Sequence, residues 1–243
     1  MQLSVAAVIS AAGSSSRMGG VKKEYLCLPG EKSTVLGAAV SAFASSKRIG
    51  LIVIVVPPAS TAQASLPPEL CSDEFLSNEG QNRIHFVSGG STRRASVHNA
   101  LSFLEAHHPS FVLIHDGARP WVKLNLIEQV IDAAIRYEAV IPALPLTETP
   151  KELSGSEFAR GVRFIKRHLR RAELCVAQTP QGFKFPEILR AHEKAAEREA
   201  RENFEYTDDA EVWGEFIGQV AMIPGDPGNR KITYPEDLGG KSL

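Results

Sequence analysis

The chain alternates short apolar runs with longer stretches of helical periodicity, and this alternation limits the folds open to it. The apolar runs are rich in Val and Ile and are apolar at successive positions, as expected of strands covered on both faces. They lie at residues 3–10, 50–56, 84–88, 111–115, 139–144 and 219–223. Residues 35–44, 92–106 and 124–137 carry the apolar spacing of helices. The sequence therefore predicts an α/β fold with a doubly wound, mainly parallel sheet.

Two polar segments interrupt this pattern. Residues 57–82 are rich in Pro, Ser and Ala and are expected to form a long surface connection with room for a short helix. Residues 147–172 include Gly-Ser turns and the partly alternating run 162–167, so we expect an arm that projects from the sheet. Because a strand pair is marginally stable alone, this arm is expected to pack on another subunit. We therefore predict a single domain, 1–243, with 147–172 as a dimerisation arm.

Charge and composition disfavour several classes of partner. A formal net charge of -1 gives no general attraction for nucleic acid or an anionic membrane, so any anion must be bound by a local basic cluster. No apolar run approaches the ~20 residues of a membrane span, and the N-terminal run lacks the features of a signal peptide. Cys27, Cys71 and Cys175 lack the spacing of zinc ligands and are expected to be free thiols in a reducing cytoplasm.

The loop after the first predicted strand has the composition of a phosphate-binding loop. Residues 10–18 read Ser-Ala-Ala-Gly-Ser-Ser-Ser-Arg-Met, and Lys22 and Lys23 follow. Small residues let the backbone approach an anion closely, exposed N–H groups face the anion, and Arg and Lys neutralise it. The glycine spacing fits neither the G-x-G-x-x-G dinucleotide fingerprint nor a P-loop. Taken alone, this loop is equally compatible with an ordinary strand-to-helix turn.

Two further polar clusters follow later strands. Ser88-Gly-Gly-Ser-Thr-Arg-Arg-Ala-Ser96 lies between a strand and a helix. Its glycines permit a tight turn and close approach to a ligand, while Ser91 or Thr92 can cap the helix. His115-Asp-Gly-Ala-Arg-Pro120 ends a strongly apolar strand, at the edge of an open α/β sheet where ligands bind. Its carboxylate and guanidinium can bind a metal or sugar hydroxyls, or can simply pair with each other.

The C-terminal third contains three segments that carry little weight individually. Residues 171–181 and 229–238 each contain basic side chains, but surface Lys and Arg are usually solvated. Thr207-Asp208-Asp209 precedes an apolar-periodic run, for which helix capping at the positive end of the helix dipole is the favoured explanation. These segments become informative only in combination with the loops described above.

Seven motifs occur in one order from about residue 4 to residue 238, nearly the whole chain. They are Ala11-Ala-Gly-x-x-x-Arg17-Met, Lys23-x-Tyr-Leu, Gly89-Gly90-x-x-Arg93-x-x-Ser96-Val, His115-Asp-x-Ala-Arg119-Pro, Thr179-Pro-Gln181, Thr207-Asp208-Asp209-Ala and Lys231-Ile-Thr-x-Pro-Glu-Asp-Leu. Together they resemble the 2-C-methyl-D-erythritol 4-phosphate cytidylyltransferase family of the non-mevalonate isoprenoid pathway. Each motif is only moderately specific, but the ordered set is strong evidence.

The resemblance implies a Rossmann-like nucleotidyltransferase fold with a mixed, largely parallel sheet. It also implies a cytoplasmic homodimer whose projecting β-arm reaches into its partner. The implied reaction transfers a cytidylyl group from CTP to methylerythritol phosphate and releases pyrophosphate, with Mg²⁺ as the cofactor. Because the attacking phosphate is already ionised near neutral pH, such a site needs positioning and charge stabilisation rather than a general base.

The resemblance also implies roles for individual residues. Arg17 and Lys23 are expected to contact the triphosphate and stabilise the transition state, with Mg²⁺ bridging phosphate oxygens near Asp116. Arg171 and Lys231 are expected to position the incoming phosphate. The other expected contacts to nucleotide and polyol come from Ala11, Ala12, Gly13, Gly90, Ser96, Asp116, Gly117, Arg119, Thr149 and Thr179. Thr149 and Arg171 would come from the partner's arm, which makes the active site composite. Lys22 stands where the family usually has Pro.

Three other functions compete with this interpretation. A cytidylyltransferase for another polyol phosphate, notably ribitol 5-phosphate, shares the first loop and the Asp-x-Ala-Arg-Pro motif, so the acceptor-lining residues would discriminate. A nicotinamide-dependent dehydrogenase is disfavoured by the glycine spacing and by the lack of an obvious acidic ribose partner after the second strand. A non-catalytic dimeric binding protein is disfavoured because Arg17, Lys23 and Lys231 are all retained.

Overall fold

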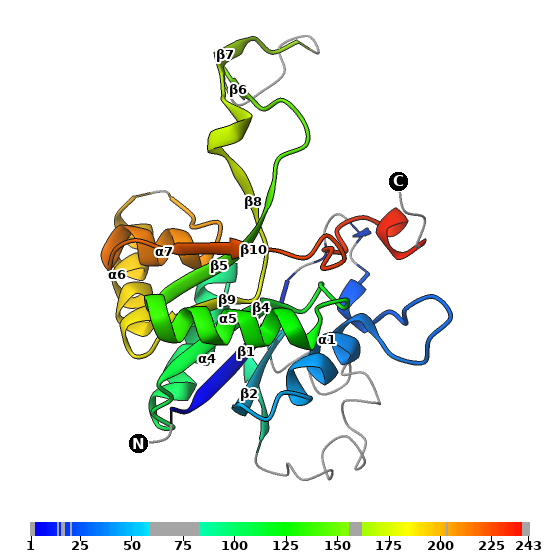
Figure 1. Cartoon of the computed structure of the whole chain (residues 1–243), viewed down its shortest axis with the longest axis vertical. Coiled ribbons are helices and arrows are strands. Elements are labelled where there is room, and N and C mark those ends of the chain that lie inside the picture. The colour runs from blue at the N-terminus through cyan, green and yellow to red at the C-terminus, as the bar shows by residue number, and fades with distance from the viewer. Residues whose placement is uncertain are drawn as a thin grey trace.

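A central, mainly parallel β-sheet organises the protein (Figure 1). The structure is a computed structural model that describes residues 3–13, 15, 18–19, 21–58, 83–155, 162–202 and 204–239. Eight strands form the sheet, in the order β10-β5-β9-β4-β1-β2-β3, with β8 paired to β5 beside this path. They are β1 (Val5–Ser10), β2 (Ile49–Val56), β3 (Ile84–Ser88), β4 (Phe111–Asp116), β5 (Ala139–Pro145), β8 (Cys175–Ala177), β9 (Gln181–Lys184) and β10 (Ala221–Pro224). The predicted doubly wound α/β fold is confirmed.

The direction of strand addition reverses at β1, and this reversal creates a place for a ligand. β1 pairs in parallel with β2 on one side and with β4 on the other. The chain therefore adds β2 and β3 on one side of β1 before it crosses to β4. In open α/β sheets, ligands bind outside the carboxyl ends of the strands at such a switch point. Ser10 and Asp116 are register partners at this edge, which brings the loops after β1 and β4 together.

Helices cover both faces of the sheet and bury its alternating side chains. They are α1 (Val35–Ala44), α4 (Arg93–Glu105), α5 (Leu124–Tyr137), α6 (Glu187–Arg201) and α7 (Asp209–Phe216). α1 and α5 share a core with Ile9 of β1, whereas α4, α6 and α7 share a second core with Val8. Successive side chains of a strand point to opposite faces, and both residues are fully buried. Double coverage thus explains why β1 is apolar at nearly every position.

The predicted strands and helices all form, but α6, β8 and β9 were not expected from the sequence. α6 is rich in charged residues, and its buried side chains, such as Ile188 and Ala195, interrupt that charge only on one face. β8 and β9 are short and run antiparallel to their neighbours. In β9, a Cβ at Gly182 would lie 2.9 Å from Val130 of α5, so glycine lets the helix pack closely on the sheet. These short strands make the sheet mixed.

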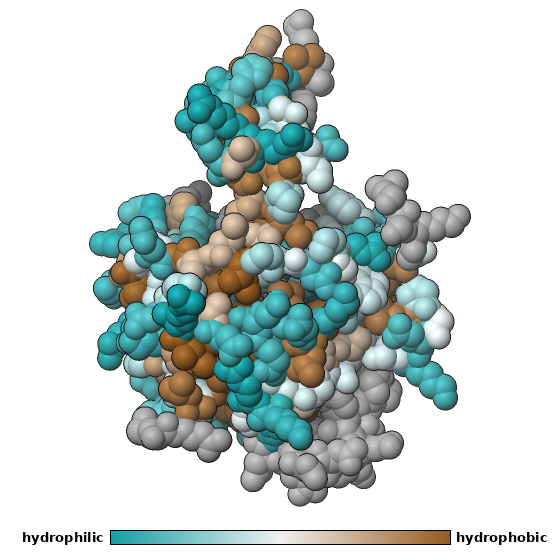
Figure 2. Space-filling model, viewed as in Figure 1, coloured by the Kyte–Doolittle hydropathy of each residue, from teal (hydrophilic) through white to brown (hydrophobic). Residues whose placement is uncertain are grey.

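Between β5 and β8 the chain leaves the body as a hairpin arm. β6 (Lys151–Leu153) pairs antiparallel with β7 (Ile165–His168), and the 3-10 helix η4 (Arg171–Glu173) lies on the returning limb. The arm stands clear of the sheet and its helices (Figure 1), and apolar side chains appear on its tip and stem (Figure 2). The arm therefore projects as expected, whereas its role in dimerisation stays a prediction. Residues 156–161 of the arm lie outside the described residues.

Three other expectations concern the surface connection, the cysteines and membrane spans. Residues 59–82 of the predicted connection, with Cys71, lie outside the described residues. Cys27 and Cys175 are free and exposed. No helix in the described ranges has the length and apolar character needed to cross a membrane.

Candidate active site

A cleft of about 620 Å³ opens at the carboxyl ends of the four parallel strands β1 to β4. Each strand contributes the segment that follows it: Gly13 after β1, Pro57 after β2, Gly90 after β3 and Ala118 after β4. Lys22, Lys23 and Lys231 line the same cleft from segments further along the chain. The cleft therefore lies at the switch point, with basic side chains at its mouth and floor.

The loop between β3 and α4 forms one wall of the cleft. Thr92 caps α4 by accepting a hydrogen bond from the backbone N–H of Ala95 at 3.0 Å. Ser96 Oγ accepts from the Gly90 N–H at 3.0 Å and donates to the Thr92 carbonyl at 2.8 Å. A Cβ at Gly90 would lie 2.6 Å from the Ala95 side chain, so this turn requires glycine. Ser96 thus holds the Gly90 backbone in the wall.

The first loop and the following 3-10 helix η2 (Lys23–Tyr25) are bonded to each other. The Lys22 ammonium donates to the Gly13 carbonyl, and Ser15 Oγ donates to Glu24 Oε2 at 3.2 Å. Lys23 is 8% exposed, and both it and Glu24 line the cleft. These contacts hold the loop after β1 across the entrance to the cleft.

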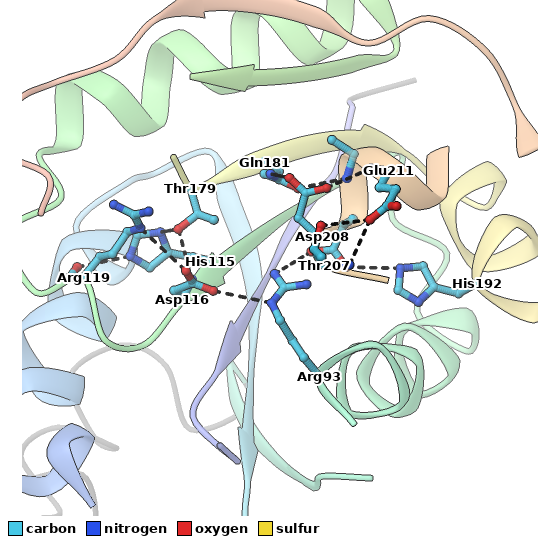
Figure 3. A network of polar contacts seen from close by, with 12 residues as sticks. Arg93, His115, Asp116, Arg119, Thr179, Gln181, His192, Thr207, Asp208 and Glu211 are labelled. Carbon is cyan, nitrogen blue, oxygen red and sulfur yellow. Dashed lines mark hydrogen bonds and ion pairs between the residues drawn. The ribbon is translucent and has the colours of Figure 1, made fainter. Parts of the chain in front are cut away.

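Asp116, at the end of β4, lies among three cationic side chains (Figure 3). Its Oδ2 is 2.8 Å from Lys231 Nζ and 3.6 Å from Arg119 Nε, and its Oδ1 is 3.7 Å from Arg93 Nε. Burial alone would raise the pKa of this carboxyl, but the charges of Lys231, Arg93 and Arg119 outweigh burial and hold the pKa well below its usual range. One anion thus holds three cations, and the excess positive charge suits a polyanionic ligand.

His115 supports this arrangement from below without acting as an acid or a base. Its Nε2 lies 3.2 Å from the Arg119 carbonyl, which can only accept, so Nε2 carries the proton. Thr179 Oγ1 then donates to Nδ1 at 3.0 Å and accepts from the Asp116 N–H at 3.1 Å. Burial lowers the pKa of His115 to about 4, so the ring is neutral at physiological pH. Its role is to fix the turn that carries Asp116.

Lys231 reaches Asp116 because the loop that carries it is anchored on both sides. Ile232 is fully buried and donates its N–H to the Ala118 carbonyl at 2.9 Å. On the other side, Asn229 is buried and its Nδ2 donates to the Thr179 carbonyl at 2.7 Å. These contacts tie the C-terminal loop to the ends of β4 and β9, and they aim Lys231 into the cleft.

The structure gathers most of the site residues that were predicted from the sequence. Those that line the cleft are Ala12, Gly13, Lys23, Gly90, Ser96, Asp116 and Lys231. Ala11, Gly117, Arg119 and Thr179 do not line it but bond to or directly precede residues that do. Thr149 and Arg171 lie on the arm, where Arg171 Nη1 donates to the Thr147 carbonyl at 2.6 Å, and neither lines the cleft. Arg17 lies outside the described residues.

Arg93 and Asp209 belong to the site, although the sequence analysis gave neither of them a role. Arg93 lines the cleft, and its Nη2 is 2.7 Å from Asp209 Oδ2. Asp208 caps α7 by accepting from the Glu211 N–H at 2.9 Å, as expected, but Asp209 is buried and turned toward Arg93. The position of Arg93, in the first turn of the helix after the Gly90 loop, was the available signal.

The chain resembles known proteins over its whole length. Residues 5–241 match the family described as IspD: 2-C-methyl-D-erythritol 4-phosphate cytidylyltransferase. The chain is 34% identical over 233 residues to the 2-C-methyl-D-erythritol 4-phosphate cytidylyltransferase of Geobacillus thermodenitrificans, across 96% of this chain and 92% of that protein. It is 38% identical over 242 residues to a bifunctional enzyme IspD/IspF of Solidesulfovibrio magneticus, across 97% of this chain and 56% of that protein. It thus spans about half the length of the bifunctional relatives.

Solved structures with this fold have related descriptions. The 4-diphosphocytidyl-2C-methyl-D-erythritol synthase of Anaerococcus prevotii superposes with a TM-score of 0.77 at 26% identity, across 98% of this chain and 93% of that one. The 2-C-methyl-D-erythritol 4-phosphate cytidylyltransferase of Thermus thermophilus superposes with a TM-score of 0.69 at 31% identity, across 98% of this chain and 96% of that one. With its cationic cleft at the switch point and a family match from residue 5 to residue 241, the chain belongs to the 2-C-methyl-D-erythritol 4-phosphate cytidylyltransferase (IspD) family.

Proposed function

We propose that the protein transfers a cytidylyl group from CTP to 2-C-methyl-D-erythritol 4-phosphate, with release of pyrophosphate. The observation that carries this proposal is the convergence of Lys23, Arg93 and Lys231 on one cleft at the switch point of a chain of this family. A phosphate oxygen of the acceptor attacks the α-phosphorus of CTP while the bond to the pyrophosphate oxygen breaks. The product is 4-diphosphocytidyl-2-C-methyl-D-erythritol.

The cleft suits this reaction because two polyanions must be brought together and their charge stabilised. Backbone groups of Ala12, Gly13 and Gly90 offer room for the nucleotide, and Lys23 lies where the triphosphate would extend. Lys231, held by Asp116 at 2.8 Å, is in place to receive the acceptor phosphate. No residue is required to remove a proton, because the attacking phosphate is already ionised. The neutral, fully bonded His115 agrees with such a mechanism.

A Mg²⁺ ion fits the cleft as a partner of the nucleotide phosphates. In the described ranges, no group of three or more His, Cys, Asp or Glu side chains could hold a metal ion by itself. Asp116 is the carboxylate at the end of β4, and it already contacts three cations, so a metal would depend mainly on phosphate oxygens. When bound, Mg²⁺ supplies charge neutralisation at those oxygens. Activity is therefore expected to disappear with EDTA and to return with added Mg²⁺.

The arm supports a cytoplasmic homodimer with composite active sites. Its exposed apolar side chains are Leu153, Val162, Phe164, Ile165, Leu174 and Val176, and Phe164 is 75% exposed. An exposed apolar surface of this kind on a two-stranded hairpin is typical of an interaction surface. If the arm inserts into a second copy, Thr149 and Arg171 are carried toward the partner's cleft. Arg171 would then contact the acceptor phosphate in a site that it does not reach within its own subunit.

The test is a pyrophosphate-release assay with purified protein and Mg²⁺. CTP, UTP and ATP are each combined with methylerythritol phosphate and with ribitol 5-phosphate. We expect turnover with CTP and methylerythritol phosphate; turnover with ribitol 5-phosphate instead would reassign the acceptor, and silence in all combinations would exclude the enzyme. Replacement of Lys23 by Met should lower kcat by roughly 10²-fold, as loss of a transition-state charge partner does. Lys194→Met, at an exposed position of α6 remote from the cleft, is the matched control.

A further inference from the structure

A row of buried charged side chains leads from the cleft to the outer helices α6 and α7 (Figure 3). Arg93, in the first turn of α4, contacts Asp116 through Nε at 3.7 Å and Asp209 through Nη2 at 2.7 Å. On the far side of Asp209, His192 Nε2 lies 3.2 Å from Oδ1. The side chains of His192 and Asp209 are 0% and 1% exposed. The mechanism described above makes no use of these two buried residues.

The buried carboxylate of Asp209 is not explained by the needs of α7. Helix capping is already provided by Asp208, whose Oδ1 accepts from Glu211. α7 packs on the sheet through apolar side chains, among them Trp213, which stacks on Phe183 with ring centroids 5.7 Å apart. Burial of an ion pair is often no more favourable than a well-packed apolar pair of similar volume. The position of the charge therefore points to a role in the cleft.

What Asp209 does in this structure is to restrain Arg93. An arginine side chain has several rotatable bonds, so its guanidinium is placed only if something holds it. Here Asp209 and Asp116 engage two of its three nitrogens from opposite sides. Nη1 makes no hydrogen bond or ion pair to any residue in the described ranges, and the side chain is 25% exposed where it lines the cleft. The arrangement presents one pre-oriented donor to a ligand.

We propose that Asp209 and His192 are positioning residues, which hold Arg93 so that Nη1 donates to an oxygen of the bound nucleotide. The inference rests on the proposed function in taking that nucleotide to be CTP. Arg93 is the residue that touches the ligand, whereas Asp209 orients Arg93 and His192 orients Asp209. The outer helices α6 and α7 thereby contribute to binding, although neither carries a group that contacts the nucleotide itself.

The test is a double-mutant cycle on the dissociation constant of CTP, measured by titration calorimetry in Mg²⁺ without acceptor. Asp209→Asn keeps the shape of the side chain and removes its charge, and we expect it to weaken binding by about 10-fold. Arg93→Met should weaken binding at least as much. In the Arg93→Met background, Asp209→Asn should then change the dissociation constant by less than about twofold, because its effect passes through Arg93. His192→Gln should show the same dependence with a smaller effect.

The matched control is Asp208→Asn, which removes a neighbouring carboxylate that caps α7 and does not contact Arg93. It should lower Tm and leave CTP affinity within about twofold of wild type. Additive effects of Arg93→Met and Asp209→Asn would overturn the proposal, as would an Asp209→Asn variant that loses stability but binds CTP normally. His192→Gln provides the same comparison if Asp209→Asn does not fold.

Binding and turnover separate this inference from the proposed function. A wild-type protein that binds CTP with the expected coupling but uses no acceptor would support the inference and overturn the function. A wild-type protein that transfers the cytidylyl group while Asp209→Asn binds CTP normally would do the reverse. Inorganic triphosphate serves as a second ligand, and failure of the wild type to bind either ligand would overturn both.

Discussion

Replacement of Arg93 by Met should make the stability of the protein depend on pH in a way that the wild type does not. The change removes the cation closest to Asp209, whose Oδ2 lies 2.7 Å from Arg93 Nη2. Asp209 remains buried among the side chains of α6 and α7. Asp116 keeps Lys231 and Arg119 as partners, so the perturbation falls mainly on Asp209.

The size of the effect follows from the pKa of Asp209. Burial alone would raise this pKa, but Arg93 and His192 lower it to about 2. Relative to about 3.9 in the unfolded chain, the shift corresponds to on the order of 2–3 kcal/mol of stability. This contribution is fully present above about pH 4 and is lost as the pH falls toward 2. Removing one partner of a buried pair costs about 3–5 kcal/mol at neutral pH.

In the Arg93→Met protein the sign of the linkage is reversed. Burial is then no longer outweighed, so the pKa of Asp209 rises above its unfolded value and the charged form is disfavoured. As the pH falls through this raised pKa, the Asp209–His192 pair takes up a proton. Each pH unit below it returns up to about 1.4 kcal/mol. The deficit relative to wild type should therefore be largest near pH 7.5 and shrink steadily toward pH 5.

Urea denaturation followed by circular dichroism, at intervals between pH 7.5 and pH 5, measures this deficit. The double variant Arg93→Met/Asp209→Asn is the control, because it has no buried carboxylate left to titrate. It should be more stable than Arg93→Met alone at pH 7.5, with a deficit that does not change with pH. A constant deficit for Arg93→Met, or a double variant less stable than the single one, would refute the reasoning.

Three further predictions concern the cleft wall and the arm. Ser96→Ala leaves the Gly90 N–H without its acceptor and should raise the KM for CTP by roughly 3- to 10-fold in initial-rate measurements, and an unchanged KM would remove this role. Phe164→Ser, at a position that is 75% exposed, should convert the dimer to a monomer in light scattering after size-exclusion chromatography; a monomeric wild type would contradict the dimer. Mixing Arg171→Ala chains with Lys23→Ala chains should restore up to about a quarter of the wild-type rate, because one site of each hybrid dimer keeps both residues. Absence of rescue would argue against shared sites.

The central sheet and the helices around it could be predicted well because their burial leaves a direct trace in the sequence. Strands covered on both faces need apolar residues at successive positions, and β1, β2 and β4 have them. β9 leaves no such trace, because a run of four residues that includes Gln181 and Gly182 has no readable period. α6 was missed because most of its surface is charged and its apolar stripe is narrow. Short or largely solvated elements are selected by what packs against them.

The cleft could be predicted in outline for a related reason. Parallel strands bring the segments that follow them to one edge of the sheet, so loops rich in Gly and basic residues after β1, β3 and β4 must converge. The spacing of Lys23, Gly90 and Asp116 relative to their strands was therefore informative. Lys231 was expected only through the family resemblance, because its loop is placed by Asn229 and Ile232 and not by a strand that precedes it.

The sequence by itself determined which strands are buried on both faces, that they run largely parallel, and which loops meet at the switch point. Only the tertiary structure decided which charges lie next to one another. Arg93 and Asp209 are 116 residues apart and meet because α4 and α7 pack on the same face of the sheet. His192 joins them from α6. Apolar periodicity reports the burial of a single element, whereas a contact between side chains of three helices depends on how those helices pack together.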